Sequence, residues 1–165
     1  MIVSFGMRLI RLLGATLLLV LISSPAFADA TLFIGTTTTP TNRPAKGFAV
    51  GMGLLAVGFE FEFAETSENL AEAAPSLRTG MGNVLAQTPV AVAGMQFYLT
   101  TGGGVYRELQ GDRQETHVGI NTGGGVKVSL LGPVRARLDY RVFKLRGEPL
   151  HSTVHRVYAG LNLSF

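Results

Sequence analysis

Apolar and polar residues alternate along most of the chain from about residue 30 onward. The clearest case is the segment 134–143, where one set of alternate residues is apolar and the other set carries most of the charge. The apolar set is Val134, Ala136, Leu138, Tyr140 and Val142, and the other set is Arg135, Arg137, Asp139, Arg141 and Phe143. The segments 58–64, 118–130 and 156–165 alternate in the same way. Because side chains of a β-strand point to opposite faces in turn, this pattern predicts an all-β fold.

Eight strands fit the length of the chain best. A tilted strand that crosses a bilayer needs about 9–11 residues, and ten such strands would leave too few residues for their connections. We expect strands at 30–37, 47–54, 58–66, 77–86, 92–107, 116–130, 134–146 and 154–165. Long outward loops are expected at 38–46, 67–76, 108–115 and 147–153, and short turns at 55–57, 87–91 and 131–133. The turn at 55–57 has a weak signal, so one long strand over 48–64 is an alternative.

Alternation alone fits either a soluble sandwich with a buried apolar face or a membrane barrel with an outward apolar face. The charges favour the barrel, because they follow strand rows instead of gathering in loops. Each Arg or Lys facing the bilayer midplane would cost about 2–4 kcal/mol, so the apolar faces must point to lipid. We predict an eight-stranded antiparallel up-and-down transmembrane β-barrel. A soluble periplasmic barrel with a lipocalin-like ligand is a more remote alternative.

The first 28 residues have the three parts of a secretory signal peptide. Arg8 and Arg11 give a basic start, the run 12–22 is apolar, and Ala26-Phe27-Ala28 is an A-x-A cleavage site. The apolar run is shorter than the roughly 20 residues of a transmembrane helix, although an uncleaved N-terminal anchor is the alternative. We therefore predict export, cleavage after Ala28, and a mature barrel domain over residues 29–165.

The last eight residues carry a second signal. Phe165 ends the chain, with Leu163 two positions before it, Gly160 five before it and Tyr158 seven before it. This spacing resembles the C-terminal assembly signal of bacterial outer-membrane barrels. Together with the leader and the strand pattern, it makes the chain similar to the small barrel superfamily that includes the outer-membrane protein A transmembrane domain and the opacity-like proteins. The resemblance implies a place in the bacterial outer membrane, contact with its lipids, and recognition of the last strand by the barrel-assembly machinery.

Charged side chains on the inward faces are expected to form a network. An eight-stranded interior is just wide enough for side chains to fill, and buried charges need partners. Basic residues outnumber acidic ones on these faces, so we predict ion pairs with an excess of positive charge, partly wetted by water. The expected members are Glu60, Glu62, Lys127, Arg135, Arg137, Asp139, Arg141 and Arg156. We interpret the network as structural packing, and a narrow pore is the alternative, because basic linings favour anions.

Two glycine triplets form a further feature of the strands. The sequence Thr-Gly-Gly-Gly-Val occurs at 101–105 and again at 122–126. If the hairpin is centred between Arg113 and Gln114, Gly103 faces Gly124 and the triplets meet. Glycine kinks help a sheet to curve into a barrel, so we predict a curvature patch with a small inner hollow. The patch comprises Gly102, Gly103, Gly104, Gly123, Gly124 and Gly125.

Composition narrows the possible chemistry. The 165-residue chain has no cysteine, which excludes disulfides and thiolate metal sites, and a near-neutral mature domain gives no reason to expect nucleic-acid binding. The candidates for catalysis are His117, His151, Ser152 and His155. On a strand His151 and Ser152 would point to opposite faces, so they are not expected to pair, and His117 is expected to cap the interior. We predict no catalytic residue, metal or cofactor.

The functional expectation follows from the resemblance. It implies a non-enzymatic outer-membrane barrel with a structural or surface-interaction, adhesin-like role. The outward loops would provide a surface for a ligand, since loops on a rigid scaffold often carry function. The alternatives are a narrow anion-preferring pore and a lipid-acting outer-membrane hydrolase that would depend on Ser152.

Overall fold

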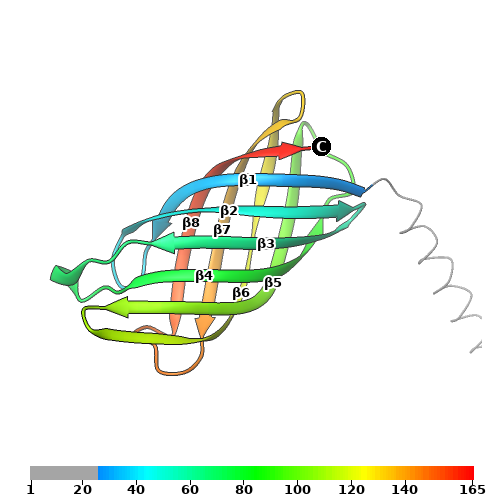
Figure 1. The fold of residues 1–165 in the computed structure, drawn as a ribbon. Helices are drawn as coiled ribbons and strands as arrows, with labels where there is room; N and C mark the ends of the chain where they lie inside the picture. The colour runs from blue at the N-terminus through cyan, green and yellow to red at the C-terminus, as the bar shows by residue number, and fades with distance from the viewer. Residues whose placement is uncertain (1–25) are drawn as a thin grey trace, which may run out of the picture.

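The computed structural model describes residues 26–165, which form a closed barrel of eight strands (Figure 1). The strands are β1 (Ala26–Thr37), β2 (Arg43–Leu54), β3 (Val57–Thr66), β4 (Ser76–Gln87), β5 (Met95–Gln110), β6 (Arg113–Leu131), β7 (Val134–Leu145) and β8 (Thr153–Ser164). Each strand pairs antiparallel with the next, and β8 pairs with β1 to close the sheet. The predicted eight-stranded up-and-down barrel is therefore confirmed. Within residues 26–165, no helix has the length and apolar character needed to cross a bilayer.

The two ends of the barrel differ in the segments that they carry. Ala28 and Phe165 exchange two backbone hydrogen bonds of 2.9 Å, so the start of β1 and the end of the chain lie together. We call this the terminus end, and it also carries the connections 55–56, 88–94 and 132–133. The opposite, loop end carries the connections 38–42, 67–75, 111–112 and 146–152, with the 3-10 helix η1 (Leu70–Glu72) in the second of them.

Two predicted connections have different outcomes. The weakly signalled turn after β2 exists, because Leu55 adopts a positive φ of 51° and reverses the chain between β2 and β3. The alternative of one long strand over 48–64 is therefore wrong. The long loop predicted at 108–115 is also wrong, since β5 and β6 continue to Gln110 and Arg113. A two-residue turn joins them, in which Gly111 takes a φ of 55° that favours glycine.

The early turn shifts the register of the β5–β6 hairpin, so the predicted contact between the glycine triplets is wrong. Gly103 faces Ile120, and Gly124 faces Leu99. The inward glycines of the two triplets instead allow close approach to neighbouring strands: a Cβ on Gly104 would collide with the β4 backbone, and one on Gly125 with the β7 backbone. Side chains fill the space inside the second triplet, where Tyr98 lies against Gly125.

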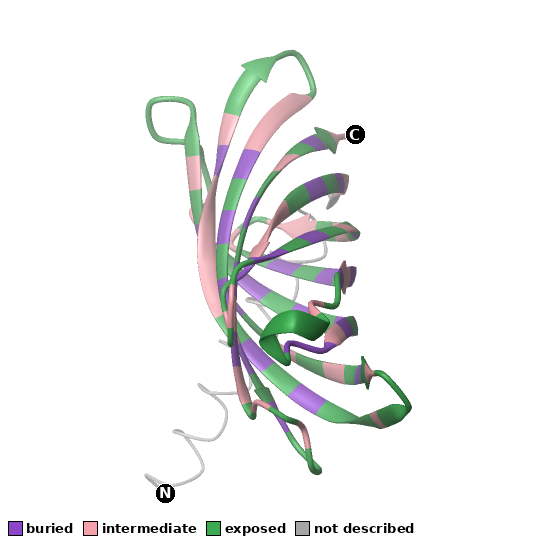
Figure 2. Cartoon of the chain, turned by 90° about the vertical axis from the view of Figure 1, so that its left-hand side faces the viewer, coloured by how far each residue is buried: buried purple, intermediate pink, exposed green. Residues whose placement is uncertain are grey.

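Burial alternates along most strands, with one face exposed and the other buried (Figure 2), although β6 alternates only in part. Leu32 is 72% exposed, Phe61 50% and Leu161 59%, and all three point away from the interior. Most charged residues in the middle of the strands, such as Glu60, Arg137 and Arg156, point inward and are buried. A continuous apolar belt of this size has no place on a soluble monomer but matches the lipid-facing surface of a transmembrane barrel.

The predicted leader lies mostly outside the described residues. Of its 28 residues, only Ala26–Ala28 are described, and they belong to β1, where their backbone pairs with Met52–Leu54 of β2. Cleavage after Ala28 stays a prediction.

Candidate functional site in the barrel interior

Six charged side chains from three strands meet at the centre of the barrel. We call them the central ion cluster: Glu60 and Glu62 of β3, Arg137, Asp139 and Arg141 of β7, and Arg156 of β8. Each is at most 5% exposed. Alternation places all six on inward faces, and β8 and β1 close the barrel so that β7 lies across the interior from β3.

Each arginine of the cluster contacts at least one carboxylate. Arg137 pairs with Glu60 and, at 3.0 Å, with Asp139. Arg141 bridges three acids, with nitrogen–oxygen distances of 2.7 Å to Glu60, 3.0 Å to Asp139 and 3.1 Å to Glu62. Arg156 lies 3.3 Å from Glu62. Arginine suits this arrangement because its planar guanidinium can serve several acceptors at once.

Two buried tyrosines occupy further hydrogen-bonding positions of the cluster. Tyr98 donates its hydroxyl hydrogen to Asp139 and accepts a 2.7 Å hydrogen bond from Arg137. Tyr158 donates to Glu62 over 3.1 Å and accepts from Arg141 over 3.2 Å. The sequence prediction did not include Tyr98, although its inward position follows from the alternation of β5.

An apolar cluster fills the interior on the loop side of these charges. Its members are Leu77, Met81, Tyr106, Phe143, Leu145 and Val154, each at most 5% exposed. The guanidinium of Arg156 lies 4.5 Å from the ring centre of Phe143, which joins the apolar cluster to the central ion cluster. Sequence reasoning placed Phe143 on the charged face of its strand but did not identify this apolar layer.

The terminus end of the interior is hollow. A cavity of about 420 Å³ is bounded by polar side chains of Asp29, Gln87, Gln96, Lys127, Arg135 and Ser164, and by apolar ones that include Leu55, Leu85 and Val90. Lys127 forms an ion pair with Asp29. Arg135 is half-buried and hydrogen bonds to the neutral side chains of Gln96 (3.1 Å) and Ser164 (3.3 Å).

The structure therefore brings seven of the eight predicted network residues into interior ion pairs, and places Arg135 apart at the cavity wall. The predicted excess of basic charge is reduced by a residue that was not predicted. Asp29 balances Lys127, and three carboxylates face three arginines in the central ion cluster. Asp29 was not predicted as a member of the network because it lies near the start of β1, where the sequence shows little alternation that would indicate an inward side chain.

The four residues of the predicted assembly signal divide between the two faces of β8. Tyr158 is buried and stacks on Phe33 with ring centres 4.1 Å apart. Gly160 also faces inward, and a Cβ there would lie 2.9 Å from the Cβ of Phe33. Leu163 and Phe165 are exposed on the lipid-facing side.

The histidines lie apart from the central ion cluster. The backbone N–H of Val118 donates to Nδ1 of His117, an exposed residue beside Gly147 of the β7–β8 loop. Its expected role as a cap of the interior stays a prediction. Nδ1 of His155 lies 2.7 Å from the hydroxyl of Tyr140. Within residues 26–165, no histidine is hydrogen-bonded to a serine or a carboxylate, and no group of three or more His, Asp or Glu side chains could hold a metal ion.

Comparison with known proteins shows that the chain is similar in structure to solved proteins but not in sequence to curated ones. No protein-family model matches the chain, and no curated protein matches its sequence significantly. Neisserial surface protein A matches with a TM-score of 0.64 at 13% identity, over 85% of this chain and 96% of its own. The N-terminal β-barrel domain of Pseudomonas aeruginosa OprF matches with a TM-score of 0.62 at 15% identity, over 84% and 97%. The outer membrane enzyme PagL matches with a TM-score of 0.51 at 9% identity, over 82% and 98%.

These proteins share one barrel architecture but differ in activity, since their number includes an enzyme. A common fold does not fix a function, which depends on the residues grafted onto it. The strand order, the outward apolar belt and these likenesses agree: the chain has the fold of the small eight-stranded bacterial outer-membrane β-barrels.

Proposed function

We propose that this protein is a sealed, non-catalytic barrel of the bacterial outer membrane that presents its loops as a surface-interaction module. The observation that carries the proposal is the filled interior. The apolar cluster at the loop side and the central ion cluster behind it are both almost fully buried. A barrel packed in this way serves as a rigid anchor, whereas a pore needs a hydrated path through its centre.

The connections at the loop end support the proposed surface-interaction role, because hydrogen bonds hold them together. The backbone N–H of Gly111 donates to Glu68 over 3.0 Å, which joins the β5–β6 turn to the β3–β4 loop. The N–H of Glu148 donates to Glu115 over 3.2 Å, and that of Leu150 donates to Glu108 over 2.9 Å. Three connections are thus held as one surface, which lowers the entropy cost of binding a partner.

The apex of this surface carries an exposed apolar side chain. Leu70, in η1, is 66% exposed and is flanked by the exposed carboxylates of Glu68 and Glu72. An apolar residue within a polar rim is the usual arrangement of a protein-binding site. We therefore expect the β3–β4 loop to be the main contact with a surface ligand.

Conductance in planar bilayers distinguishes a sealed anchor from a pore. The refolded barrel is expected to give no steady current steps at neutral pH. Steady anion-selective steps would overturn the sealed-anchor proposal in favour of the pore. Folding is checked in the same preparation by gel mobility in SDS, since a folded barrel is expected to shift its mobility only after heating.

Adherence of cells that display the barrel tests the surface role. Cells are applied to wells coated with laminin, fibronectin or collagen, and Leu70→Ser is compared with the unaltered barrel and with Leu161→Val on the lipid-facing side. Binding to one coating that is lost only in Leu70→Ser supports the proposal. The hydrolase alternative is tested by Ser152→Ala, which is expected to leave any lipid deacylation unchanged.

Assembly through the last strand is a further part of the proposal. Leu163 and Phe165 are exposed on the lipid-facing side, where a membrane-embedded assembly factor could reach them. Phe165→Ser is expected to lower the amount of barrel in the outer-membrane fraction, whereas Ser164→Ala, which faces inward, is expected to have little effect.

A further inference from the structure

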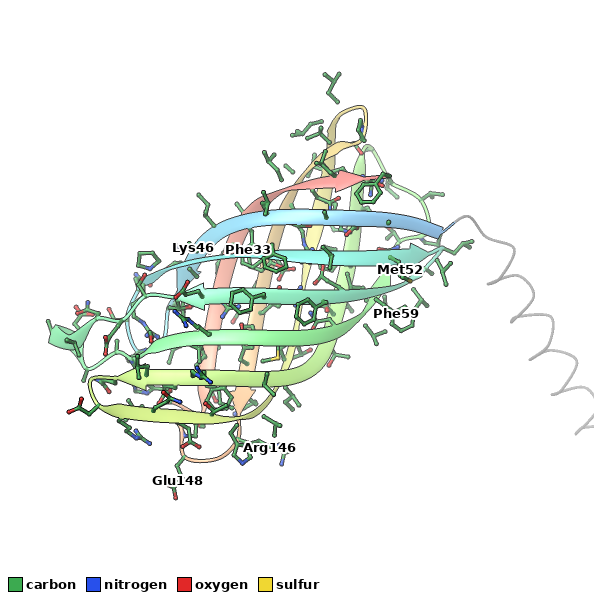
Figure 3. The ribbon with its side chains drawn as sticks, in the orientation of Figure 1. Phe33, Lys46, Met52, Phe59, Arg146 and Glu148 are labelled. Atoms are coloured by element: carbon green, nitrogen blue, oxygen red, sulfur yellow. The ribbon has the colours of Figure 1, made fainter. Side chains whose placement is uncertain are left out.

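Charged side chains form a row across the lipid-facing surface, at the loop end of four neighbouring strands. Lys46 of β2 faces Glu65 of β3, Glu65 faces Arg78 of β4, and Arg78 faces Arg107 of β5. Figure 3 shows Lys46 towards the loop end, with Met52 and Phe59 nearer the terminus end. Because all four positions share the parity of the apolar belt, the row marks the edge of the belt on the loop side.

The row contains three basic residues but one acidic residue, Glu65. Glu65 accepts from Arg78 through Nε (3.0 Å) and Nη2 (2.9 Å), and within residues 26–165 the side chains of Lys46 and Arg107 form no ion pair. Arg78 and Arg107 lie directly opposite each other on adjacent strands. Like charges in this position destabilise a sheet, and an anion bound between them would remove the repulsion. A phosphate matches two guanidinium groups in both charge and geometry.

A strip of glycines begins on the same face directly below Arg78, while on β5 the exposed Val105 lies between Arg107 and Gly103. The strip consists of Gly80 and Gly82 on β4 and Gly103 on β5, and Gly82 faces Gly103 across the strand pair. A Cβ on Gly80 or Gly82 would meet nothing nearer than 3.9 Å, and one on Gly103 nothing nearer than 3.5 Å. The barrel therefore has room for side chains here, unlike at the inward glycines, and the smooth strip needs another explanation.

The strip is bordered by aromatic side chains. Phe63 faces Gly80 and Phe61 faces Gly82 across the β3–β4 pair, and both rings are exposed to lipid. A shallow hollow on this face is lined by Phe61, Gly82 and Val84, among others. A hydrocarbon chain could lie along the glycines against the phenylalanine rings and bury apolar surface on both sides.

We propose that this face holds one lipid with a phosphorylated headgroup. Its phosphate lies between Arg78 and Arg107, and one acyl chain follows the strip of Gly80, Gly82 and Gly103. Lys46 adds positive charge at the edge of the site. The proposal rests on the membrane placement given above, since it assigns the lipid to the leaflet at the loop end.

Native mass spectrometry of the barrel in neutral detergent tests this site with two probes. One is lipid A with both phosphates, and the other is the same lipid A after removal of its phosphates. The unaltered barrel is expected to bind the phosphorylated lipid about tenfold more tightly, since a difference of about 1.4 kcal/mol corresponds to a factor of ten. Equal binding of the two lipids would overturn the proposal without the need for any variant.

Variants then locate the site on the surface. Arg78→Gln with Arg107→Gln is expected to bind phosphorylated lipid A at least about tenfold more weakly. The matched control, Arg113→Gln with Arg146→Gln, removes two charges from the loop end outside the row and is expected to bind as the unaltered barrel does. Gly82→Val keeps every charge but fills the strip, and is also expected to weaken binding. Equal losses in both double variants, or no loss in the first, would contradict the site.

The same samples separate this proposal from the proposed function. A barrel that shows the heat-dependent gel shift and gives no conductance, yet binds both lipids equally, would refute the lipid site and leave the sealed anchor in place. A barrel that conducts but binds the phosphorylated lipid more tightly would refute the sealed anchor and support the lipid site.

Discussion

Glu60 provides the most direct test of the central ion cluster. Its carboxylate contacts Arg137 and lies 2.7 Å from Arg141, and the side chain is almost fully buried. Glu60→Gln keeps the shape but leaves three arginines facing two carboxylates. Breaking a buried ion pair by removing one partner typically costs about 3–5 kcal/mol, a large part of a stability that is usually about 5–15 kcal/mol. With a urea dependence of about 2 kcal/mol per molar, the unfolding midpoint should fall by roughly 2 M.

Urea titration of the barrel in lipid vesicles, followed by far-UV circular dichroism, measures this change. The matched control is Glu65→Gln on the same strand, whose exposed pair with Arg78 should contribute less than about 1 kcal/mol. Glu60→Gln with Arg137→Gln restores the balance of charge and should lose less than the sum of the two single variants, by about 0.5–3 kcal/mol. If Glu60→Gln costs no more than the control, or if the two losses simply add, the charges are hydrated individually and the cluster does not act as a unit.

Three further variants test other parts of the interior by the same titration or by the heat-dependent gel shift. Phe143→Ala removes a fully buried ring from the apolar cluster and should lower stability by about 3–5 kcal/mol; a loss below 1 kcal/mol would mean that water or neighbours fill the space. Lys127→Gln should cost less than Glu60→Gln, because Asp29 is only half-buried beside the cavity, and the opposite order would contradict the layered interior. Gly125→Val should prevent folding, since its Cβ would collide with the β7 backbone and Tyr98, whereas Gly82→Val should fold and show the gel shift.

The strands and their facing could be predicted from the sequence because the barrel wall has two chemically different sides. The arginine row of 134–143 shows this best, since no other facing keeps those charges out of hydrocarbon. The β5–β6 register could not be derived in the same way. Both sides of that hairpin contain glycine, threonine and valine, so alternation does not distinguish one turn position from another, and only the positive φ of Gly111 settles where the chain reverses.

The order of the charged and apolar layers inside the barrel also could not be predicted from the sequence. The apolar cluster uses Leu77 and Met81 of β4 and Phe143 of β7, which come together only because the strands are staggered around the barrel. Alternation predicts that a residue points inward but not its height along the axis. For the same reason, Lys127 could be predicted to need an acid, but its pairing with Asp29, 98 residues earlier, could not.

The ion pairs of the interior have a consequence for the order in which the chain can fold. Asp29, Glu60 and Glu62 belong to the first three strands, whereas Lys127, Arg137, Arg141 and Arg156 belong to the last three. Glu60 and Arg137 are 77 residues apart, and Glu62 and Arg156 are 94 apart. A nascent chain that has only begun to cross the cell envelope therefore carries acids whose counter-charges have not yet arrived. Such distant pairings form late and slowly, so closure of the barrel and neutralisation of its interior should be a single cooperative event.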